Sequence, residues 1–361
     1  MPERFLFTNG NIDSETVDQE KTNEQIASFF GSEFFNGERE LPKEAKKFLP
    51  IMRTHMTRKQ EGYGLKQNEK RDSFGGLQYV QEYIAKEVDL DRIHYISPDA
   101  YDRSVAGEEI SGPSYGLYDA SSQAIFLREK ETLASDDLET KASPITELSK
   151  FFRMIQHESL HLVSYEADYL GTSGRIKLYR QGYMVFNPKY NWERFRGLNE
   201  AVIETANVGL FYDEISDLMK TFPDSKKEDW MRGRASYQEY RTVLSDIIQN
   251  IAKADDRDSL DVWKDFEKGL FTGRMKHLSN IDRIYGSGSL RLLASMGSYQ
   301  GDTVKEKPEN ISQKDWIISR QDIYMRYFQE PLPKEERIAL AQEVLSDREY
   351  GRFLAMNDSK K

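Results

Sequence analysis

Residues 157–161 read His157-Glu158-Ser159-Leu160-His161 and place two imidazole side chains four positions apart. Residues four apart on an α-helix lie on the same face, so both histidines can reach one metal ion. Glu158 then lies about 100° round the helix from His157, where it can reach a metal-bound water without being a metal ligand. The chain contains 5 histidines, and two of them fall in this pentapeptide. On a helix, the stretch predicts half of a metal site.

The residues around this pentapeptide have the spacing of one long helix, from Pro144 to about Ala167. Thr146 or Ser143 can cap its N-terminus, and proline is tolerated near the first helical position. Apolar residues recur at helical intervals, namely Leu148, Phe151, Phe152, Ile155, Leu160 and Val163. We therefore expect both histidines to lie deep inside a helix.

A zinc site needs at least three protein ligands, and a catalytic site keeps one further position open for water. The extended H-E-x-x-H-x-x-G-x-x-H pattern is excluded, because Ser164 replaces its glycine and Ala167 replaces its third histidine. The other choice is a glutamate from a second helix. Segment 197–206 predicts that helix, with Glu200 and Glu204 four residues apart on one face. One carboxylate can bind the metal, and the other can hydrogen-bond a histidine ligand from outside.

The two segments H-E-S-L-H and L-N-E-A-V-I-E resemble the gluzincin metallopeptidases, which include thermolysin-like and minigluzincin-like proteins. The resemblance covers about residues 110–215. Its implied site holds one zinc ion per chain, with His157, His161 and Glu200 as ligands and with Glu204 and Asn199 outside them. Glu204 as the ligand is the alternative. The gap between the two motifs is longer than in thermolysin-like enzymes, which implies an inserted segment.

Two segments near these motifs alternate apolar and polar residues, as short strands do. Residues 175–186 alternate around Gly182, which predicts a hairpin inside the inserted segment. Residues 115–127 predict two strands around a turn at residues 119–122. By the gluzincin resemblance, a strand at this place forms the edge of the substrate cleft, where an extended peptide pairs through its main chain. That strand would be 116–119 or 124–127.

The pattern along the chain favours an α+β fold. The gluzincin resemblance implies that this fold is zincin-like. Residues 1–75 form a charged, partly helical N-terminal extension. Residues 76–172 form an α+β subdomain with a small mixed sheet, an edge strand and the histidine helix. Residues 173–361 hold the hairpin and a mainly α-helical subdomain that carries the glutamate ligand. Apolar spacing predicts helices in this last region at 237–254, 260–270, 281–296 and 334–345.

Composition narrows the class of protein further. The 361 residues are 31% charged and 38% hydrophobic, as in a globular protein with a polar surface. A net charge of −10 argues against a nucleic-acid partner. The sequence has no run of 18 apolar residues, so it predicts no membrane span. No secretory signal is visible, so a cytoplasmic location is the default expectation. The lack of cysteine excludes disulfides and thiolate ligands.

The gluzincin resemblance implies a zinc metallopeptidase that acts on a peptide or protein substrate. Zinc would activate a water molecule, and Glu158 would take its proton as general base. The lack of a G-x-M-E-N-like signature favours an endopeptidase. A second donor would hold the developing oxyanion. The candidates for that donor are Tyr183, Tyr237 and His277, together with Tyr179 and Tyr240.

Two other functions stay open. One is a zincin-scaffold protein that binds or regulates a partner without turnover, and the intact Glu158 argues against it. The other is an interaction module with a purely structural zinc, which would need a closed site with a fourth ligand. No fourth histidine or cysteine is placed for that role.

Overall fold

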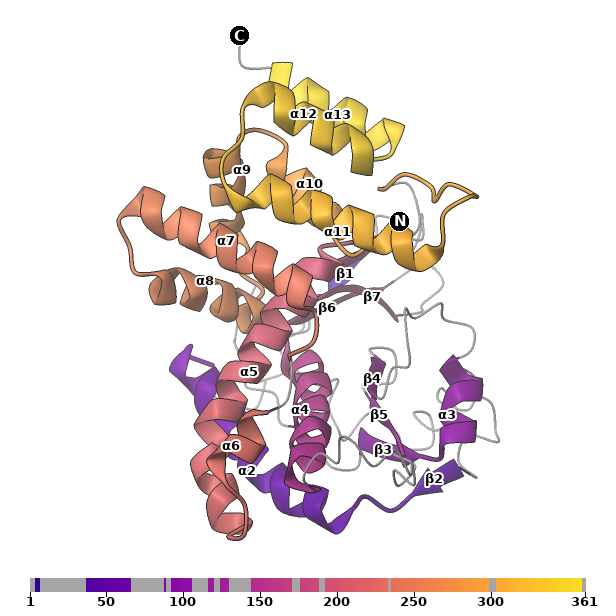
Figure 1. The fold of residues 1–361 in the computed structure, drawn as a ribbon, viewed down its shortest axis with the longest axis vertical. Helices are drawn as coiled ribbons and strands as arrows, with labels where there is room; N and C mark the ends of the chain where they lie inside the picture. The colour runs from indigo at the N-terminus through magenta and orange to yellow at the C-terminus, as the bar shows by residue number, and fades with distance from the viewer. Residues whose placement is uncertain are drawn as a thin grey trace. The chain divides into compact units, whose positions relative to one another are not determined.

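The structure is a computed structural model of residues 1–361. It describes residues 4–6, 37–65, 88, 92–105, 116–119, 124–129, 144–170, 176–187, 192–232, 235–298 and 303–358. Helices and strands are mixed along this part of the chain, which confirms the expected α+β class (Figure 1).

The helices lie mostly in the second half of the chain. In the first half they are α2 (Lys43–Gly62), α3 (Pro98–Val105) and α4 (Pro144–Val163). In the second half they are α5 (Arg196–Thr221), α6 (Lys227–Met231), α7 (Gln238–Asp255), α8 (Ser259–Thr272), α9 (Ser279–Tyr285), α10 (Ser289–Ser295), α11 (Gln313–Gln329), α12 (Lys334–Val344) and α13 (Asp347–Asp358).

One sheet is small and mixed, as the sequence predicts. Its strands are β2 (Glu38–Arg39), β3 (Ile93–Ile96), β4 (Gly116–Asp119) and β5 (Ala124–Arg128), in the spatial order β2-β3-β5-β4. The pair β3 and β5 is parallel, and the other two pairs are antiparallel. Strand β4 therefore lies at the edge of the sheet as described, and α4 packs against both β4 and β5.

The second sheet is antiparallel and has five described strands. They are β1 (Arg4–Leu6), β6 (Glu166–Leu170), β7 (Ile176–Gln181), β8 (Met184–Asn187) and β9 (Trp192–Arg194), joined in that order. Strands β7 and β8 form the hairpin expected at 175–186, with Gly182 in the turn at φ 53°.

The histidine helix ends earlier than the sequence predicts. Helix α4 stops at Val163, and Ala167 lies in β6. Both the amide and the hydroxyl of Ser164 donate to the carbonyl of His161, which closes the last turn. The amide of Tyr165 then donates to Leu270 O and draws the chain away into the strand.

The described residues fall into two compact units that do not follow chain order. One consists of residues 1–7, 165–206 and 235–361, and the other of residues 8–164 and 207–234. Residues 207–234 therefore group with α4 and not with the later helices. The three-region division expected from the sequence stays a prediction.

Aromatic packing joins α2 and α6 to the face of α4 that carries Phe152. Phe152 stacks on Phe48 of α2 with ring centroids 4.4 Å apart, and on Trp230 of α6 at 5.8 Å. Ser149 donates its hydroxyl to the carbonyl of Trp230 at 2.7 Å. Helix α2, which lies within the expected N-terminal extension, thus contributes to the core of this unit.

A buried pair of side chains connects α4 to the later turns of α5. Gln156 Nε2 donates to Glu214 Oε1 at 2.5 Å, and both residues are 0% exposed. Burial raises the pKa of Glu214 well above its ordinary value, and the charge of Asp213 acts in the same direction. Gln156 Oε1 and Glu214 Oε2 have no other hydrogen-bond partner within the described residues. Burial therefore favours the protonated, uncharged form of Glu214.

We expect Glu214→Gln to flatten the pH dependence of stability. Because the folded pKa lies above the ordinary value of 4.5, the contribution of Glu214 is full below that value. It is lost as the pH rises toward the folded pKa. The glutamine keeps a donor at every pH, so the variant should match the wild type at about pH 4 and exceed its melting temperature at about pH 8. The exposed neighbour change Asp213→Asn is the control, and an equal gain from it would contradict the buried-pair account.

The later helices confirm most of the sequence prediction and correct one part of it. Helices α7, α8 and α12 lie where apolar spacing predicts them. The helix predicted at 281–296 is instead two helices, α9 and α10. Gly286 and Gly288 separate them with φ values of 92° and 88°, which a right-handed helix cannot contain.

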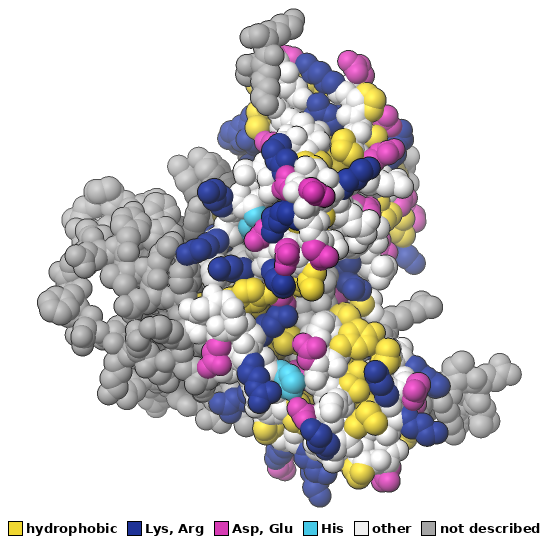
Figure 2. Space-filling model, turned by 90° about the vertical axis from the view of Figure 1, so that its left-hand side faces the viewer, with side chains coloured by type: hydrophobic (Ala, Val, Ile, Leu, Met, Phe, Trp, Pro, Cys, Tyr) yellow, Lys and Arg dark blue, Asp and Glu magenta, His cyan; other side chains and the backbone are white. Residues whose placement is uncertain are grey.

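The described surface carries charge of both signs. On the face drawn in Figure 2, Lys and Arg side chains are interspersed with Asp and Glu, with hydrophobic side chains in small groups. Among the helices that the structure describes, none combines the length and apolar character that a membrane span requires.

Candidate metal centre

Helix α4 presents the two histidines side by side. His157 and His161 are 7% and 8% exposed, and their ring centroids lie 5.1 Å apart. The apolar residues of the same helix, among them Phe152, Ile155 and Leu160, are fully buried and fix its rotation. The pair therefore lies on a fixed helix face, as the four-residue spacing predicts.

Helix α5 carries Glu200 near its N-terminal end, just after the first turn. The helix runs without interruption from Arg196 to Thr221, and Asn207 lies about two turns after Glu200. Asn207 Nδ2 donates to the carbonyl of Arg153 on α4 at 3.1 Å. Together with the buried Gln156–Glu214 pair, this bond holds the part of α5 that follows Glu200 to the part of α4 that precedes the two histidines.

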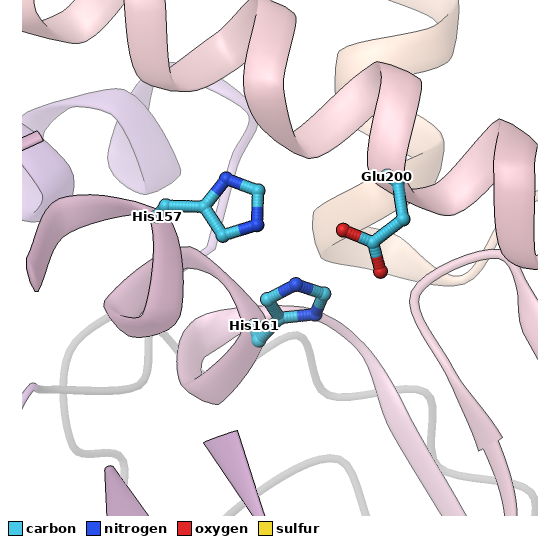
Figure 3. Close-up of side chains that lie close together, drawn as sticks. All are labelled: His157, His161 and Glu200. Carbon is cyan, nitrogen blue, oxygen red and sulfur yellow. The ribbon is translucent and has the colours of Figure 1, made fainter. Parts of the chain in front are cut away.

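The three expected ligands come together. The ligand atoms of His157, His161 and Glu200 all lie within 4.8 Å of one another, and all three residues are buried (Figure 3). Within the part of the chain that the structure describes, no other group of three such side chains is arranged in this way. Two imidazole nitrogens and one carboxylate oxygen are a donor set that zinc accepts, with a fourth position left for water or substrate. The residues present therefore fit a catalytic type of metal site.

Glu158 points toward the edge strand of the mixed sheet. A Cβ atom added to Gly116 of β4 would lie 3.0 Å from Glu158 Cγ and 3.1 Å from Glu158 Oε1. The ring of Tyr118, also on β4, stacks on His161 with centroids 6.3 Å apart. The carboxylate of Glu158 and one of the histidines thus both lie against β4, and a side chain at position 116 would require Glu158 to shift by a few tenths of an ångström.

The second carboxylate on the α5 face has a different partner. Glu204 is 2% exposed, and its Oε1 accepts a hydrogen bond from the amide of Ser236 at 2.9 Å. Its assignment as the carboxylate that orients a histidine ligand stays a prediction.

Asn199 anchors the inserted hairpin to the start of α5. Its Oδ1 accepts a hydrogen bond from the amide of Tyr183 at 2.9 Å, and the residue is fully buried. Gly182, the residue before Tyr183, approaches Asn199 closely. The inserted segment therefore returns to Asn199, the residue next to Glu200.

We expect Gly182→Ala to destabilise the fold and to disturb the third ligand. A Cβ at this position would collide with Asn199 Oδ1 and come within 2.9 Å of Leu270 Cδ1. The left-handed φ of 53° adds a cost for any other residue, about 1–3 kcal/mol in all. Thermal unfolding and metal affinity should both report the loss. Gly351→Ala in α13, where a Cβ meets nothing within 4 Å, is the control and should be neutral or stabilising.

Two of the expected oxyanion donors pair with each other. The Tyr183 hydroxyl donates to Phe266 O at 2.7 Å and lies 2.8 Å from His277 Nε2. Burial lowers the pKa of His277 to about 4 and raises the pKa of Tyr183 well above its ordinary value. At neutral pH both groups are uncharged. The neutral His277 then donates from Nε2 to the Tyr183 oxygen, because the Tyr183 proton is used by Phe266 O.

The remaining tyrosine candidates lie in different settings. Tyr237 precedes α7, is 41% exposed and stacks on Tyr240 with centroids 6.1 Å apart. Tyr179 lies in β7, but its side chain is outside the described set. The identity of the oxyanion donor therefore stays a prediction.

His55 and His94, which belong to neither motif, have carboxylate partners. His55 Nε2 lies 3.1 Å from Asp217 Oδ2, and His94 Nδ1 lies 2.8 Å from Glu38 Oε1. Each pair joins two elements of one compact unit, α2 with α5 and β3 with β2. These contacts give both residues a structural role.

Comparisons of the chain with protein-family models, with curated proteins and with solved structures find no match. The case for a function therefore rests on the two motifs and on the arrangement of their side chains.

Proposed function

We propose that this chain is a zinc-dependent metallopeptidase of the gluzincin type, and an endopeptidase within that group. The observation that carries the proposal is the convergence of His157, His161 and Glu200, whose ligand atoms lie within 4.8 Å of one another. Two motifs 39 residues apart in the sequence, counted from His161 to Glu200, supply one buried donor set. A zincin-like fold is part of the same proposal.

Zinc is the metal that the ligands favour. A His₂Glu set is typical of catalytic zinc in peptidases, and the absence of cysteine leaves no thiolate for a structural site. When bound, zinc supplies a Lewis acid that polarises a carbonyl and lowers the pKa of water at the open position. The histidines and Glu200 hold the ion, one per chain, and Asn199 holds the start of the α5 helix in place.

Glu158 is the general base in this proposal. Its neighbour His157 belongs to the group of candidate ligands. The carboxylate of Glu158 itself lies against Gly116 of the edge strand. From that place the carboxylate accepts the proton of an attacking water and then passes it to the leaving amine.

The proposed substrate is an extended peptide that pairs with β4. The sheet order places β5 between β3 and β4, so β5 has strands on both sides and cannot add another. Of the two segments that the sequence offered for the cleft edge, 116–119 is therefore the one favoured. An edge strand offers unpaired backbone groups to a peptide, and its side chains then select among sequences.

Cleavage of a peptide library tests the proposal. The purified protein should cut peptides internally, lose that activity on treatment with a metal chelator and regain it when zinc is restored. Casein cleavage under the same conditions is a second readout. Bound zinc without cleavage of either substrate would contradict the enzyme and favour a binding protein on the same scaffold.

A further inference from the structure

Helix α5 has an outward face with the residue spacing of a coiled-coil seam. Its buried face, which includes Leu210, Glu214 and Leu218, fixes the rotation of the helix. Exposed residues recur on the other side at alternating intervals of three and four. They are Gly209, Tyr212, Ser216 and Met219, called the α5 seam below. This spacing is that of the a and d positions through which two α-helices pack together.

The two large residues of the α5 seam are apolar and exposed. Tyr212 is 49% exposed and Met219 is 37% exposed, and they lie two turns apart on the same face. The outward face of a surface helix normally carries charged and polar residues instead. Gly209 and Ser216 are small, and a Cβ atom added to Gly209 would meet nothing within 4 Å. Large and small residues therefore alternate along the seam, which suits the interdigitation of a second helix.

Two charges of opposite sign flank the α5 seam on one side. Asp213 and Lys220 each follow a large seam residue by one position, so both occupy e positions of the same pattern. Lys220 binds Asp217 at 2.7 Å, but its side chain stays 73% exposed and has further donors. Among the residues that the structure describes, none forms an ion pair with Asp213. Each copy of the helix thus offers one acidic and one basic group beside the seam.

A second copy of the chain matches this pattern of charges. When two identical helices pack antiparallel, the two-fold axis maps each side of the pair onto itself, so e positions face e positions. An axis close to Ser216 brings Asp213 of each copy beside Lys220 of the other and makes two equal ion pairs. The same axis places the small Ser216 at the closest approach and sets Tyr212 against the partner's Met219. A parallel pair would instead set Asp213 against the apolar Val208.

We propose that the α5 seam is the interface of a homodimer in which two copies of α5 pack antiparallel about Ser216. Each copy contributes the same surface, so the interface closes on two chains. The stretch from Gly209 to Lys220 is about 17 Å long, which makes a contact smaller than a standard interface. The dimer is therefore weak, with a dissociation constant in roughly the micromolar range. The proposal does not depend on the metal centre or on peptidase activity.

Sedimentation velocity of the full chain tests the proposal. The wild type should pass from monomer to dimer as its concentration rises through the micromolar range. Tyr212→Glu places a charge in the apolar part of the seam and should weaken the dimer by at least about tenfold. A wild type that stays monomeric throughout this range would leave the seam to a different partner and overturn the proposal.

Charge reversal tests the partner and the orientation together. Asp213→Lys and Lys220→Asp each set like charges against each other, so each variant alone should dimerise at least about tenfold more weakly than the wild type. An equimolar mixture of the two restores both ion pairs and should form a heterodimer. The double variant Asp213→Lys/Lys220→Asp should dimerise as the wild type does. Recovery in the mixture requires that both variants fold, and a lack of recovery in the mixture and in the double variant would overturn the proposal.

Lys264→Asp is the matched control for these variants. Lys264 of α8 forms with Asp261 the same kind of exposed pair, three residues apart, that Lys220 forms with Asp217. Reversal at position 264 should therefore leave the affinity of the dimer unchanged. An equal loss of dimer in Lys264→Asp, or wild-type affinity in Tyr212→Glu and in both single reversals, would place the contact between the copies elsewhere and overturn the proposal.

Discussion

Replacing Glu158 with glutamine should reduce peptide cleavage by about a hundred- to ten-thousandfold while leaving bound zinc at one ion per chain. Glutamine has nearly the shape of glutamate, so it can lie against Gly116 as the native side chain does. It has no basic oxygen that accepts a proton at neutral pH. The loss therefore falls on the chemical step and not on metal binding or folding.

Glu147→Gln is the matched control for this experiment. Glu147 lies on the same helix and accepts a hydrogen bond from Lys150 at 2.7 Å, in a largely exposed pair. This change should leave kcat and zinc content as they are. Equal activity in Glu158→Gln and wild type would remove Glu158 from the mechanism. Loss of zinc in Glu158→Gln would make Glu158 a ligand and overturn its role as base.

Glu200→Gln and Glu204→Gln should differ in zinc affinity. Loss of an outer partner of a metal ligand costs about 10- to 100-fold in affinity, and loss of a ligand costs more. We therefore expect Glu200→Gln to weaken zinc binding beyond that range and Glu204→Gln to stay within or below it. The glutamine at 204 can still accept the hydrogen bond from the Ser236 amide, so the fold around it is preserved.

Competition with a chelator of known affinity measures both constants. Circular dichroism of the two variants without metal checks that each is folded. The reverse order of affinities would make Glu204 the third ligand and Glu200 its outer partner. Equal, unchanged affinities in both variants would remove the carboxylate from the site altogether.

Local spacing was enough to place the histidine pair but not to choose between the two glutamates. His157 and His161 share a face because any helix places residues four apart together. Glu200 and Glu204 satisfy the same rule equally well. In the structure it is Glu200 whose ligand atom lies with those of the histidines, while Asn207 and Glu214 connect later turns of α5 to α4. No single-sequence pattern contains that contact.

The parts of the fold that the sequence missed depend on long-range pairing or on weak periodicity. Hairpin β7–β8 joins two neighbouring segments through a turn at Gly182, so the sequence alone predicts it. Strand β6 pairs with the distant β1 as well as with the following β7, and β9, which pairs with the preceding β8, has only 3 residues in which to show an alternating pattern. Helix α11 begins with a serine N-cap, because Ser312 Oγ accepts a hydrogen bond from the Asp315 amide. Its apolar spacing alone did not reveal it.

The role of Asn199 could not be read from its motif. The N-E-A-like pattern only marks it as a neighbour of the ligand. Its actual partner, the amide of Tyr183, lies in an inserted segment that the pattern does not cover. The close approach of Gly182 could be anticipated only as a turn glycine.

Metal analysis of the purified protein tests the central claim most directly. Mass spectrometry of the metals bound to the wild type and to the double variant His157→Ala/His161→Ala compares the intact site with one that lacks both imidazoles. The account predicts one zinc ion per wild-type chain and none in the variant. A wild type that binds no metal even after incubation with zinc, or a variant that keeps the same zinc content, would contradict it.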